Sequence, residues 1–283
     1  MTILELIQKT TAFFEKKGVD EPRLQVELLL AHVLGIKRIQ LYLEFERELM
    51  EKDMDPLREM VRRRAEHEPL QYILGKTEFF GLEFKTDRRA LIPRRETEHL
   101  VETALGFFPD KNVSLNAIDL GTGTGILAIT LAIHLPNSRW MATDASAETL
   151  SLARENAERH GVDPRIRWAE GSWWNGVDTS EKFGLIISNP PYIRTADLQN
   201  LAPELRQHEP PAALDGGADG LDAYRAILAK TRNHANPGAR LALEIGFDQG
   251  QGLRELLAGH GWKLEACVKD LQGHDRVVTA SLA

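Results

Sequence analysis

The hydrophobic pattern of the chain changes near residue 75. Before that point apolar side chains recur every three or four positions, as they do on one face of a helix. The first run extends from Ile3 to Phe14 and stops at Gly18, and Asp20 is placed to cap a second helix with Pro22 in its first turn. Helices this short stabilise one another, so residues 1–75 are predicted to form a small helical bundle.

The next segment, residues 76–92, has a different pattern. Two short runs rich in aromatic residues, TEFF and LEFK, flank Gly81. Alternation around a glycine is typical of a β-hairpin. We therefore expect a hairpin linker here, between the bundle and a second domain.

From residue 93 to residue 283 apolar strand patterns alternate with helical ones. The strand candidates are NAIDL, RWMATD, RIRWAE, FGLIISN, ARLALEIG, WKLEACV and RVVTASL. This alternation predicts a doubly wound α/β domain with a seven-stranded, mostly parallel sheet, whose ligand site lies at the carboxyl ends of the strands. The last two candidates have no helix between them, so the final strand is expected to run antiparallel.

Composition narrows the class of protein. The 283 residues include 35 Lys and Arg and 42 Asp and Glu, a formal net charge of −7. An acidic protein is a poor candidate for binding nucleic acid mainly by phosphate neutralisation. The single cysteine, Cys267, excludes an internal disulfide and a thiolate cluster for zinc, and no histidine spacing suggests a metal site. With no pattern typical of a signal peptide, we expect a cytoplasmic protein.

A glycine-rich loop follows the first strand of the second domain. It reads Gly121-Thr122-Gly123-Thr124-Gly125, and a helical pattern begins directly after it. A dinucleotide-binding loop would have its third glycine at position 126, which is Ile126. Asp144, at the end of the next strand, can accept hydrogen bonds from a ribose diol. A plain turn that starts a helix is the alternative, but together these features favour S-adenosylmethionine, which has a ribose and no phosphate.

The fourth strand candidate ends in a motif that suits a planar nitrogen substrate. Its residues are Asn189-Pro190-Pro191-Tyr192. The lone pair of an amide nitrogen is delocalised, so a site must hold the NH2 group with acceptors and direct the lone pair at the methyl carbon. The Asn189 side-chain oxygen and the Pro190 carbonyl can supply two acceptors, and Tyr192 can stack on the planar group.

Several stretches resemble one family, the release-factor glutamine methyltransferases of the HemK/PrmC type. They are EPLQYILG, EFFG, LIPR, DLGTGTG, SNPPYI, HEPPAALDGGADGL and LALEIG, which span nearly the whole chain. The chain departs from the family pattern at Arg95, where a proline is common, and at Ser172, where an aspartate is common. The resemblance implies a Rossmann-like class I methyltransferase domain at residues 93–283 and a helical substrate-recognition domain at residues 1–75.

The resemblance also implies roles for individual residues. S-adenosylmethionine would be bound by Gly121, Thr122, Gly123, Thr124, Gly125, Asp144, Trp173 and Asn189. Glutamine would be held by Asn189, Pro190, Pro191 and Tyr192, of which Asn189, Pro190 and Tyr192 would be catalytic. The substrate would be the GGQ glutamine of class I peptide chain release factors, methylated at its side-chain amide nitrogen (N5), and no metal is expected.

The sequence motifs are compatible with two other functions. An N-methyltransferase acting on adenine or guanine would use the same planar NH2 chemistry, but it should carry a basic region. Residues 1–75 hold 12 basic and 14 acidic residues and the remainder holds 23 and 28, so neither part is basic. A non-catalytic binding module is the second alternative, and the intact loop and motif disfavour it.

Two further segments have more than one interpretation. The run Arg62 to Arg64 is interpreted as a solvated helix face, with a partner-binding patch as the alternative. The Gly-rich segment from Asp215 to Gly220 is either a lid over the substrate or a tolerated loop.

Overall fold

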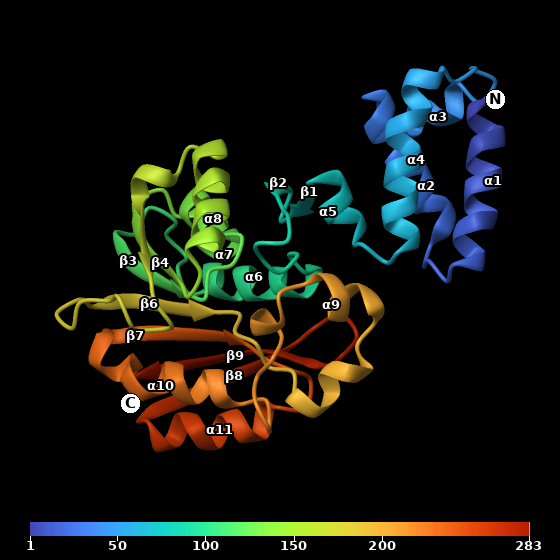
Figure 1. Cartoon of the computed structure of the whole chain (residues 1–283). Coiled ribbons are helices and arrows are strands. Elements are labelled where there is room, and N and C mark those ends of the chain that lie inside the picture. The colour runs from blue at the N-terminus through green and yellow to red at the C-terminus, as the bar shows by residue number, and fades with distance from the viewer. Residues whose placement is uncertain (283) are drawn as a thin grey trace. The chain divides into compact units, whose positions relative to one another are not determined.

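The computed structural model describes residues 1–282, and the chain forms two compact units (Figure 1). The first consists of Met1–Lys76 together with Ala202–His208, and the second of Thr77–Leu201 together with the residues from Glu209 onward. None of the helices in residues 1–282 is long and apolar enough to span a lipid bilayer.

The first unit is helical, as its apolar spacing predicts. Its helices are α1 (Ile3–Lys16), α2 (Pro22–Leu34), α3 (Arg38–Leu43), α4 (Glu51–Ala65), α5 (Leu70–Leu74) and α9 (Pro203–His208). The buried faces of α1 to α5 meet in one apolar core, to which α1 contributes Ile3 and Phe14, α2 contributes Leu29, and α4 contributes Leu57. The helices therefore stabilise one another by packing rather than by length.

The first two helices begin differently. Thr2 caps α1, because its hydroxyl accepts from the Glu5 amide at 3.2 Å while the Glu5 carboxylate accepts from the Thr2 amide at 3.1 Å. The predicted cap at Asp20 is wrong. Glu21 is the N-cap of α2, and no side chain accepts a hydrogen bond from the first turn. Pro22 at the first position still suits this start, since its missing N–H needs no partner.

The interpretation of the arginine run as a solvated face is wrong for Arg64. Arg62 is exposed and pairs with Glu59 and Glu66, but Arg64 is fully buried. Its guanidinium donates to the Glu68 carbonyl at 3.2 Å and pairs with Glu204 of α9. This pair joins residues 140 positions apart in the sequence and fixes α9 to the helical unit.

We expect Arg64→Ala to lower the free energy of unfolding of the helical unit by about 2–4 kcal/mol, because it leaves a cavity and breaks a buried ion pair. Far-ultraviolet circular dichroism is the appropriate measurement, since all five tryptophans lie between Trp140 and Trp262, outside this unit. Arg62→Ala is the matched control on the same helix and should leave the transition unchanged. Equal effects of the two variants would contradict the structural role of Arg64.

The second unit contains a seven-stranded sheet, as predicted. Its strands are β3 (Leu115–Leu120), β4 (Ser138–Asp144), β5 (Ile166–Glu170), β6 (Phe183–Ser188), β7 (Ala235–Glu244), β8 (Trp262–Lys269) and β9 (Asp275–Leu282). They lie in the order β5-β4-β3-β6-β7-β9-β8. β9 pairs antiparallel with both neighbours, whereas the other neighbouring strands are parallel. The prediction of an antiparallel final strand is confirmed.

Helices cover both faces of this sheet (Figure 1). One apolar core lies under α6 (Glu98–Gly106), α7 (Ile126–His134) and α8 (Ala147–Arg159). The other lies under α10 (Asp222–His234) and α11 (Gly250–Gly259). Successive β3 residues alternate between the two cores, Ala117 facing the first and Ile118 the second. Short 3₁₀ turns complete the unit at Arg95–Thr97 (η1), Asp163–Arg165 (η2), Thr195–Asn200 (η3) and Pro211–Ala213 (η4).

A two-stranded sheet lies within residues 76–92. It consists of β1 (Lys76–Phe79) and β2 (Leu82–Lys85). Asn156 of α8 accepts from the Lys85 amide at 2.7 Å and donates to the carbonyls of Lys85 and Thr124, each at 3.0 Å. One buried amide thus connects β2 to the glycine-rich loop.

Candidate active site

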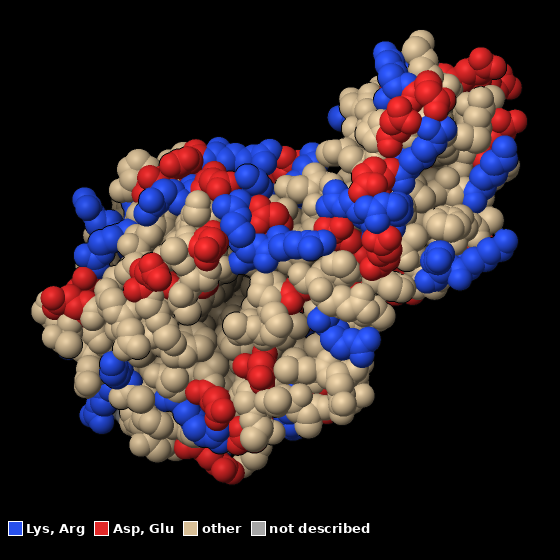
Figure 2. All heavy atoms as spheres, in the orientation of Figure 1, with Lys and Arg blue, Asp and Glu red and all other residues tan. Residues whose placement is uncertain are grey.

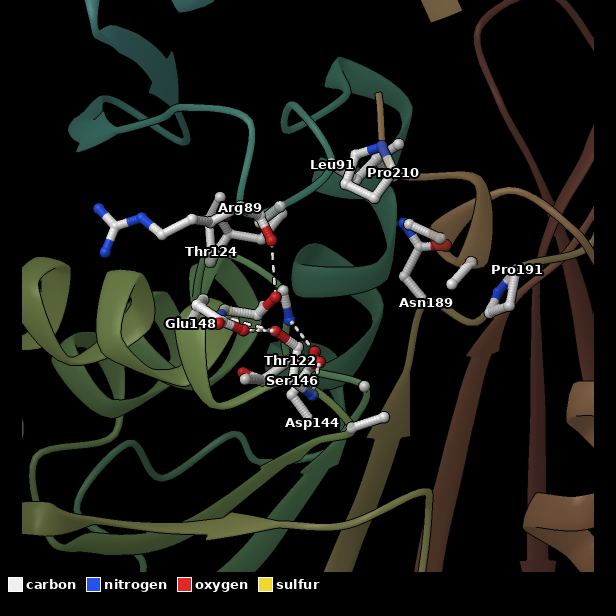
Figure 3. A pocket seen from close by; sticks show the side chains of 18 of the residues that line it. Arg89, Leu91, Thr122, Thr124, Asp144, Ser146, Glu148, Asn189, Pro191 and Pro210 are labelled. Carbon is white, nitrogen blue, oxygen red and sulfur yellow. Dashed lines mark hydrogen bonds between the residues drawn. The ribbon is translucent and has the colours of Figure 1, made fainter. Parts of the chain in front are cut away.

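A cavity of about 760 Å³ lies at the carboxyl ends of β3, β4 and β6. Eight of the residues predicted for the site line it: Gly121, Thr122, Gly123, Thr124, Asp144, Trp173, Asn189 and Pro191. Gly125, Pro190 and Tyr192 are not among its lining residues. Figure 3 shows that Asp144 lies beside Thr122 and Ser146, while Asn189, directly after the end of β6, lies toward Leu91 and Pro210. The strands on the two sides of β3 therefore present Asp144 and Asn189 to one space.

The glycine-rich loop needs its glycines for two reasons. Gly121, Gly123 and Gly125 all have positive φ angles, between 58° and 84°, which other residues adopt only at a cost. A Cβ on Gly125 would lie 2.7 Å from Ile129, whereas a Cβ on Gly123 would meet nothing within 4 Å. A side chain at Gly125 would therefore displace the tip of Ile129, whereas Gly123 leaves open space beside the cavity.

Asp144 holds this loop in place. One carboxylate oxygen accepts from the Gly123 amide at 3.1 Å and the other from the Ser146 amide at 3.1 Å. Burial raises the pKa of Asp144, and these amides oppose the shift. Each oxygen retains a lone pair for a ligand.

Trp173 borders the loop from the other side. Its φ of 54° is unusual for a bulky residue. A Cβ on Gly121 would lie 3.2 Å from the Trp173 ring, so the indole packs directly over the glycine. Trp174, next in sequence, is buried and donates to the Ile227 carbonyl at 2.7 Å. Only the first tryptophan lines the cavity.

Asn189 leaves the end of β6 with its side chain already engaged. Its Nδ2 donates to the Thr97 hydroxyl at 3.1 Å. Ser188, directly before it, donates to the Leu120 carbonyl at 2.5 Å and ties the end of β6 to β3. The Asn189 amide oxygen accepts no hydrogen bond from residues 1–282, so it can accept one from a ligand.

The Gly-rich segment packs behind Tyr192. A Cβ on Gly216 would lie 2.7 Å from the Tyr192 backbone, and one on Gly220 would lie 2.5 Å from its carbonyl oxygen. Gln249 donates from one amide nitrogen to the carbonyls of Tyr192 and Gly220, at 2.9 and 3.0 Å. The segment therefore supports the motif from behind, which neither interpretation of it as a lid or as a tolerated loop predicted.

Two loops that were not predicted from the sequence also line the cavity. They are residues 88–94 and the segment around Pro210, Ala212 and Ala213. Glu209, which is buried, joins them: its carboxylate accepts from Arg94 at 2.5 Å and from the Ile92 amide at 3.3 Å. The ion pair joins the stretches LIPR and HEPP, which are far apart in the sequence, so no local pattern predicts it.

Asp119, beneath the loop, is expected to make stability depend on pH. Its carboxylate accepts from the Thr122 hydroxyl at 2.6 Å and from the Ala128 amide at 3.3 Å, but burial raises its pKa to about 7. Because the folded state holds this proton more tightly than the unfolded state, stability falls as pH rises from about 4 to about 7, by up to about 4 kcal/mol. Asp119→Asn should remove this contribution.

Urea denaturation across this pH range checks the expectation. The difference in unfolding free energy between Asp119→Asn and the wild type should grow in favour of the variant as pH rises. Glu244, whose pKa burial also raises to about 7, should leave a residual slope in the variant. A difference that stays constant with pH would show that Asp119 is ionised throughout.

The class of protein is identified by comparison with known proteins. Residues 100–242 match the family model described as Methyltransferase small domain, and residues 5–75 match that of the PrmC N-terminal domain. A crystal structure of a methyltransferase from Pyrococcus furiosus has a similar fold, with a TM-score of 0.54 and 20% identity over 71% of this chain and 89% of that one. The second unit is a Rossmann-like methyltransferase domain.

Full-length relatives define the family. A release factor glutamine methyltransferase from Geobacter sulfurreducens is 42% identical over 98% of this chain and 95% of its own length. One from Chlorobaculum tepidum is 41% identical over 90% of this chain and 89% of its own. The chain belongs to the family of release factor glutamine methyltransferases. The resemblance drawn from EPLQYILG and NPPY is confirmed.

Proposed function

We propose that this chain methylates the side-chain amide nitrogen (N5) of the GGQ glutamine in class I peptide chain release factors, using S-adenosylmethionine. The printed names of its relatives support the substrate class. The observation that carries the proposal is that the Asn189 side chain lines the same cavity as Asp144 and the glycine-rich loop. Release factors act on the ribosome, so we expect the enzyme in the cytoplasm.

The residues of the cavity fit S-adenosylmethionine. Asp144 has lone pairs left for the ribose hydroxyls, and the open space beside Gly123 admits a ligand close to the backbone. Trp173 offers an indole face for the adenine. S-adenosylmethionine has no pyrophosphate. The loop accordingly lacks the third glycine of a dinucleotide-binding loop and has Ile126 at that position. Thr122 and Thr124 complete the cofactor side of the cavity.

The chain's own residues then hold the glutamine amide. The bound cofactor supplies an electrophilic methyl group on its sulfonium. The Asn189 oxygen and the Pro190 carbonyl accept from the two N–H bonds of the substrate, which turns the nitrogen lone pair toward the methyl group. The amide nitrogen becomes acidic as its bond to the methyl carbon forms, so it releases one proton to water and no titrating base is required. Pro191 stiffens the loop. The proposed contact of Tyr192 with the planar group requires a closer approach than this structure shows, because Tyr192 does not line the cavity.

The helical unit is proposed to recognise the release factor. Its charges do not favour a nucleic-acid substrate: Figure 2 shows basic and acidic side chains interspersed on the face in view rather than gathered into a basic patch. Residues 1–75 carry more acidic than basic groups. A protein ligand is compatible with such a mixed surface, whereas a phosphate backbone favours a basic one.

A competition between substrates tests the proposal. Labelled S-adenosylmethionine is offered with a class I release factor, with the same factor carrying alanine in place of the GGQ glutamine, and with bulk RNA or DNA. We expect label on the unmodified factor alone. Label on nucleic acid, or equal label on the alanine variant, would contradict the proposal.

A further inference from the structure

The end of the NPPY motif is held by a buried glutamine that does not itself line the cavity. Gln249 is 5% exposed and is the N-cap residue of α11. Its side-chain nitrogen, Nε2, donates to the Tyr192 carbonyl at 2.9 Å and to the Gly220 carbonyl at 3.0 Å. Its side-chain oxygen, Oε1, accepts from the Gly246 amide at 2.9 Å. One side chain therefore joins the motif to the Gly-rich segment and to the residues that follow β7.

The partners of Gln249 fix the direction in which its amide faces. The Gly246 N–H can only donate and the two carbonyls can only accept, so exchanging the side-chain oxygen and nitrogen would place like groups together. The backbone of Gln249 is held as well, because its amide donates to the Gly246 carbonyl at 3.1 Å and its carbonyl accepts from the Leu253 amide at 3.0 Å. Gln249 is thus a rigid support whose two side-chain N–H bonds point at carbonyls.

The surrounding glycines pack tightly against this contact. A Cβ on Gly220 would lie 2.5 Å from both Gln249 Nε2 and the Tyr192 carbonyl oxygen. A Cβ on Gly216 would lie 2.7 Å from Tyr192 Cα, and one on Gly246 would lie 3.1 Å from Gln249 Oε1. Atoms packed this closely cannot move independently of one another. The position of Gln249 therefore determines the position of the Tyr192 backbone.

The NPPY motif is thereby fixed at both of its ends. Ser188, directly before it, is tied to β3 by a hydrogen bond of 2.5 Å. At the other end Gln249 holds the carbonyl of Tyr192. Between these points lie Asn189 and two prolines, whose rings restrict their φ angles. A shift of the Tyr192 backbone would therefore be transmitted to the Asn189 oxygen and the Pro190 carbonyl.

We propose that Gln249 is a positioning residue for methyl transfer, which holds the Tyr192 carbonyl so that the acceptors of the NPPY motif stay aligned with the methyl group. The proposal rests on the proposed function, because those acceptors are proposed to bind the glutamine amide. A misplacement of about 1 Å between reacting groups can cost about a hundredfold in rate. Since Gln249 lies outside the cavity, its loss should lower kcat and leave cofactor binding unchanged.

Removing the hydrogen bonds of Gln249 is the first test. Gln249→Met keeps the length of the side chain, and we expect kcat for release-factor methylation to fall at least about tenfold. The Kd for S-adenosylmethionine should stay within about threefold of the wild-type value. Gln251→Met is the matched control, because Gln251 is exposed on the same helix and bonds to Glu255 at 2.8 Å. Counting cofactor-binding sites by calorimetry and expressing kcat per site excludes unfolded molecules.

Gln249→Glu gives a second signature, which a general loss of folding would not produce. A protonated carboxyl group can donate to the Tyr192 carbonyl while its other oxygen accepts from the Gly246 amide. An ionised carboxylate can only accept, so it would face two carbonyl oxygens with no proton between them. Burial raises the pKa of the introduced group. The ratio of the variant's kcat to that of the wild type should therefore fall at least about tenfold between about pH 5 and about pH 9.

The other ionisable groups near Gln249 are present in both proteins. They are Tyr192, Tyr224 of α10, Glu244 at the end of β7 and Arg276 of β9. The Tyr224 hydroxyl lies 3.3 Å from Gln249 Oε1 and donates to the Glu244 carbonyl at 2.8 Å. Taking the ratio of variant to wild type at each pH removes the titration that these groups share. Gln251→Glu places the same carboxyl group on the exposed side of α11, and its ratio should be constant with pH.

Three results would overturn the inference while leaving the proposed function standing. They are wild-type kcat in Gln249→Met, a Kd for S-adenosylmethionine that weakens in proportion to kcat, and a ratio for Gln249→Glu that does not change with pH. A wild type that does not methylate the release factor at all would overturn both.

Discussion

Replacing Asn189 by alanine is expected to lower kcat for glutamine methylation by about a hundredfold to a thousandfold, the range seen when one preorganised hydrogen-bonding group is removed from an active site. Asn189 lines the cavity and its nitrogen donates to Thr97, which leaves its oxygen as the side-chain acceptor for the substrate. The loss should fall on kcat, because the lone pair of an unheld amide seldom points at the methyl group. Single-turnover kinetics with saturating cofactor measures it.

Cofactor binding by Asn189→Ala distinguishes loss of the amide-holding role from misfolding of the variant. The Kd for S-adenosylmethionine should change by no more than about threefold, since cofactor contacts depend mainly on Asp144 and the glycine-rich loop. Asn137→Ala is the matched control, because the Asn137 side chain bonds to the Asn112 carbonyl on the surface, between α7 and β4. Near-normal turnover of Asn189→Ala would contradict the amide-holding mechanism.

Replacing Asp144 by alanine is expected to weaken binding of S-adenosylmethionine by about 1.5–3 kcal/mol, or roughly 10- to 150-fold in Kd. The carboxylate lines the cavity and is the charged acceptor beside the loop. Isothermal titration calorimetry measures the affinity directly. Asp178→Ala serves as the control, since Asp178 is exposed and bonds only within its own turn, to Ser180.

A ligand that lacks one ribose hydroxyl shows whether Asp144 contacts the ribose directly or acts by holding the glycine-rich loop. Asp144 also holds the Gly123 amide, so its loss could act through the loop. S-adenosylhomocysteine and its 2′-deoxy and 3′-deoxy forms complete a double-mutant cycle. The wild type should bind at least one deoxy form more weakly than the parent, and Asp144→Ala should bind them equally. Unchanged discrimination in the variant would place the ribose away from Asp144.

The parts of the fold that the sequence predicts are those encoded locally. Apolar runs alternating with helical patterns specify the sheet, and the lack of a helix between WKLEACV and RVVTASL predicts the antiparallel β9. The loop at Gly121 and the motif at Asn189 are each an uninterrupted sequence motif that directly follows a predicted strand. Their position at the strand ends therefore follows from the doubly wound pattern. Their convergence on one cavity is a consequence of topology.

Contacts between distant residues could not be predicted in this way. The pair of Arg64 with Glu204 is separated by 140 residues, and a buried arginine in a charged run has the same local pattern as an exposed one. For the same reason the Arg94–Glu209 pair and the contact of Thr97 with Asn189 could not be predicted from the sequence. Glu244 did carry a sequence pattern that could have been used: a single acidic residue at the carboxyl end of an apolar strand is either paired or functional.

The NPPY motif is proposed to hold the amide of one glutamine in a release factor. Peptide mass spectrometry of a release factor incubated with the enzyme and S-adenosylmethionine tests it most directly, because fragmentation assigns the methyl group to a residue and to its side chain. We predict a single methyl group on the side-chain amide nitrogen of the GGQ glutamine, absent when the enzyme carries Asn189→Ala. A methyl group on another residue, or one that persists with the variant, would contradict the account.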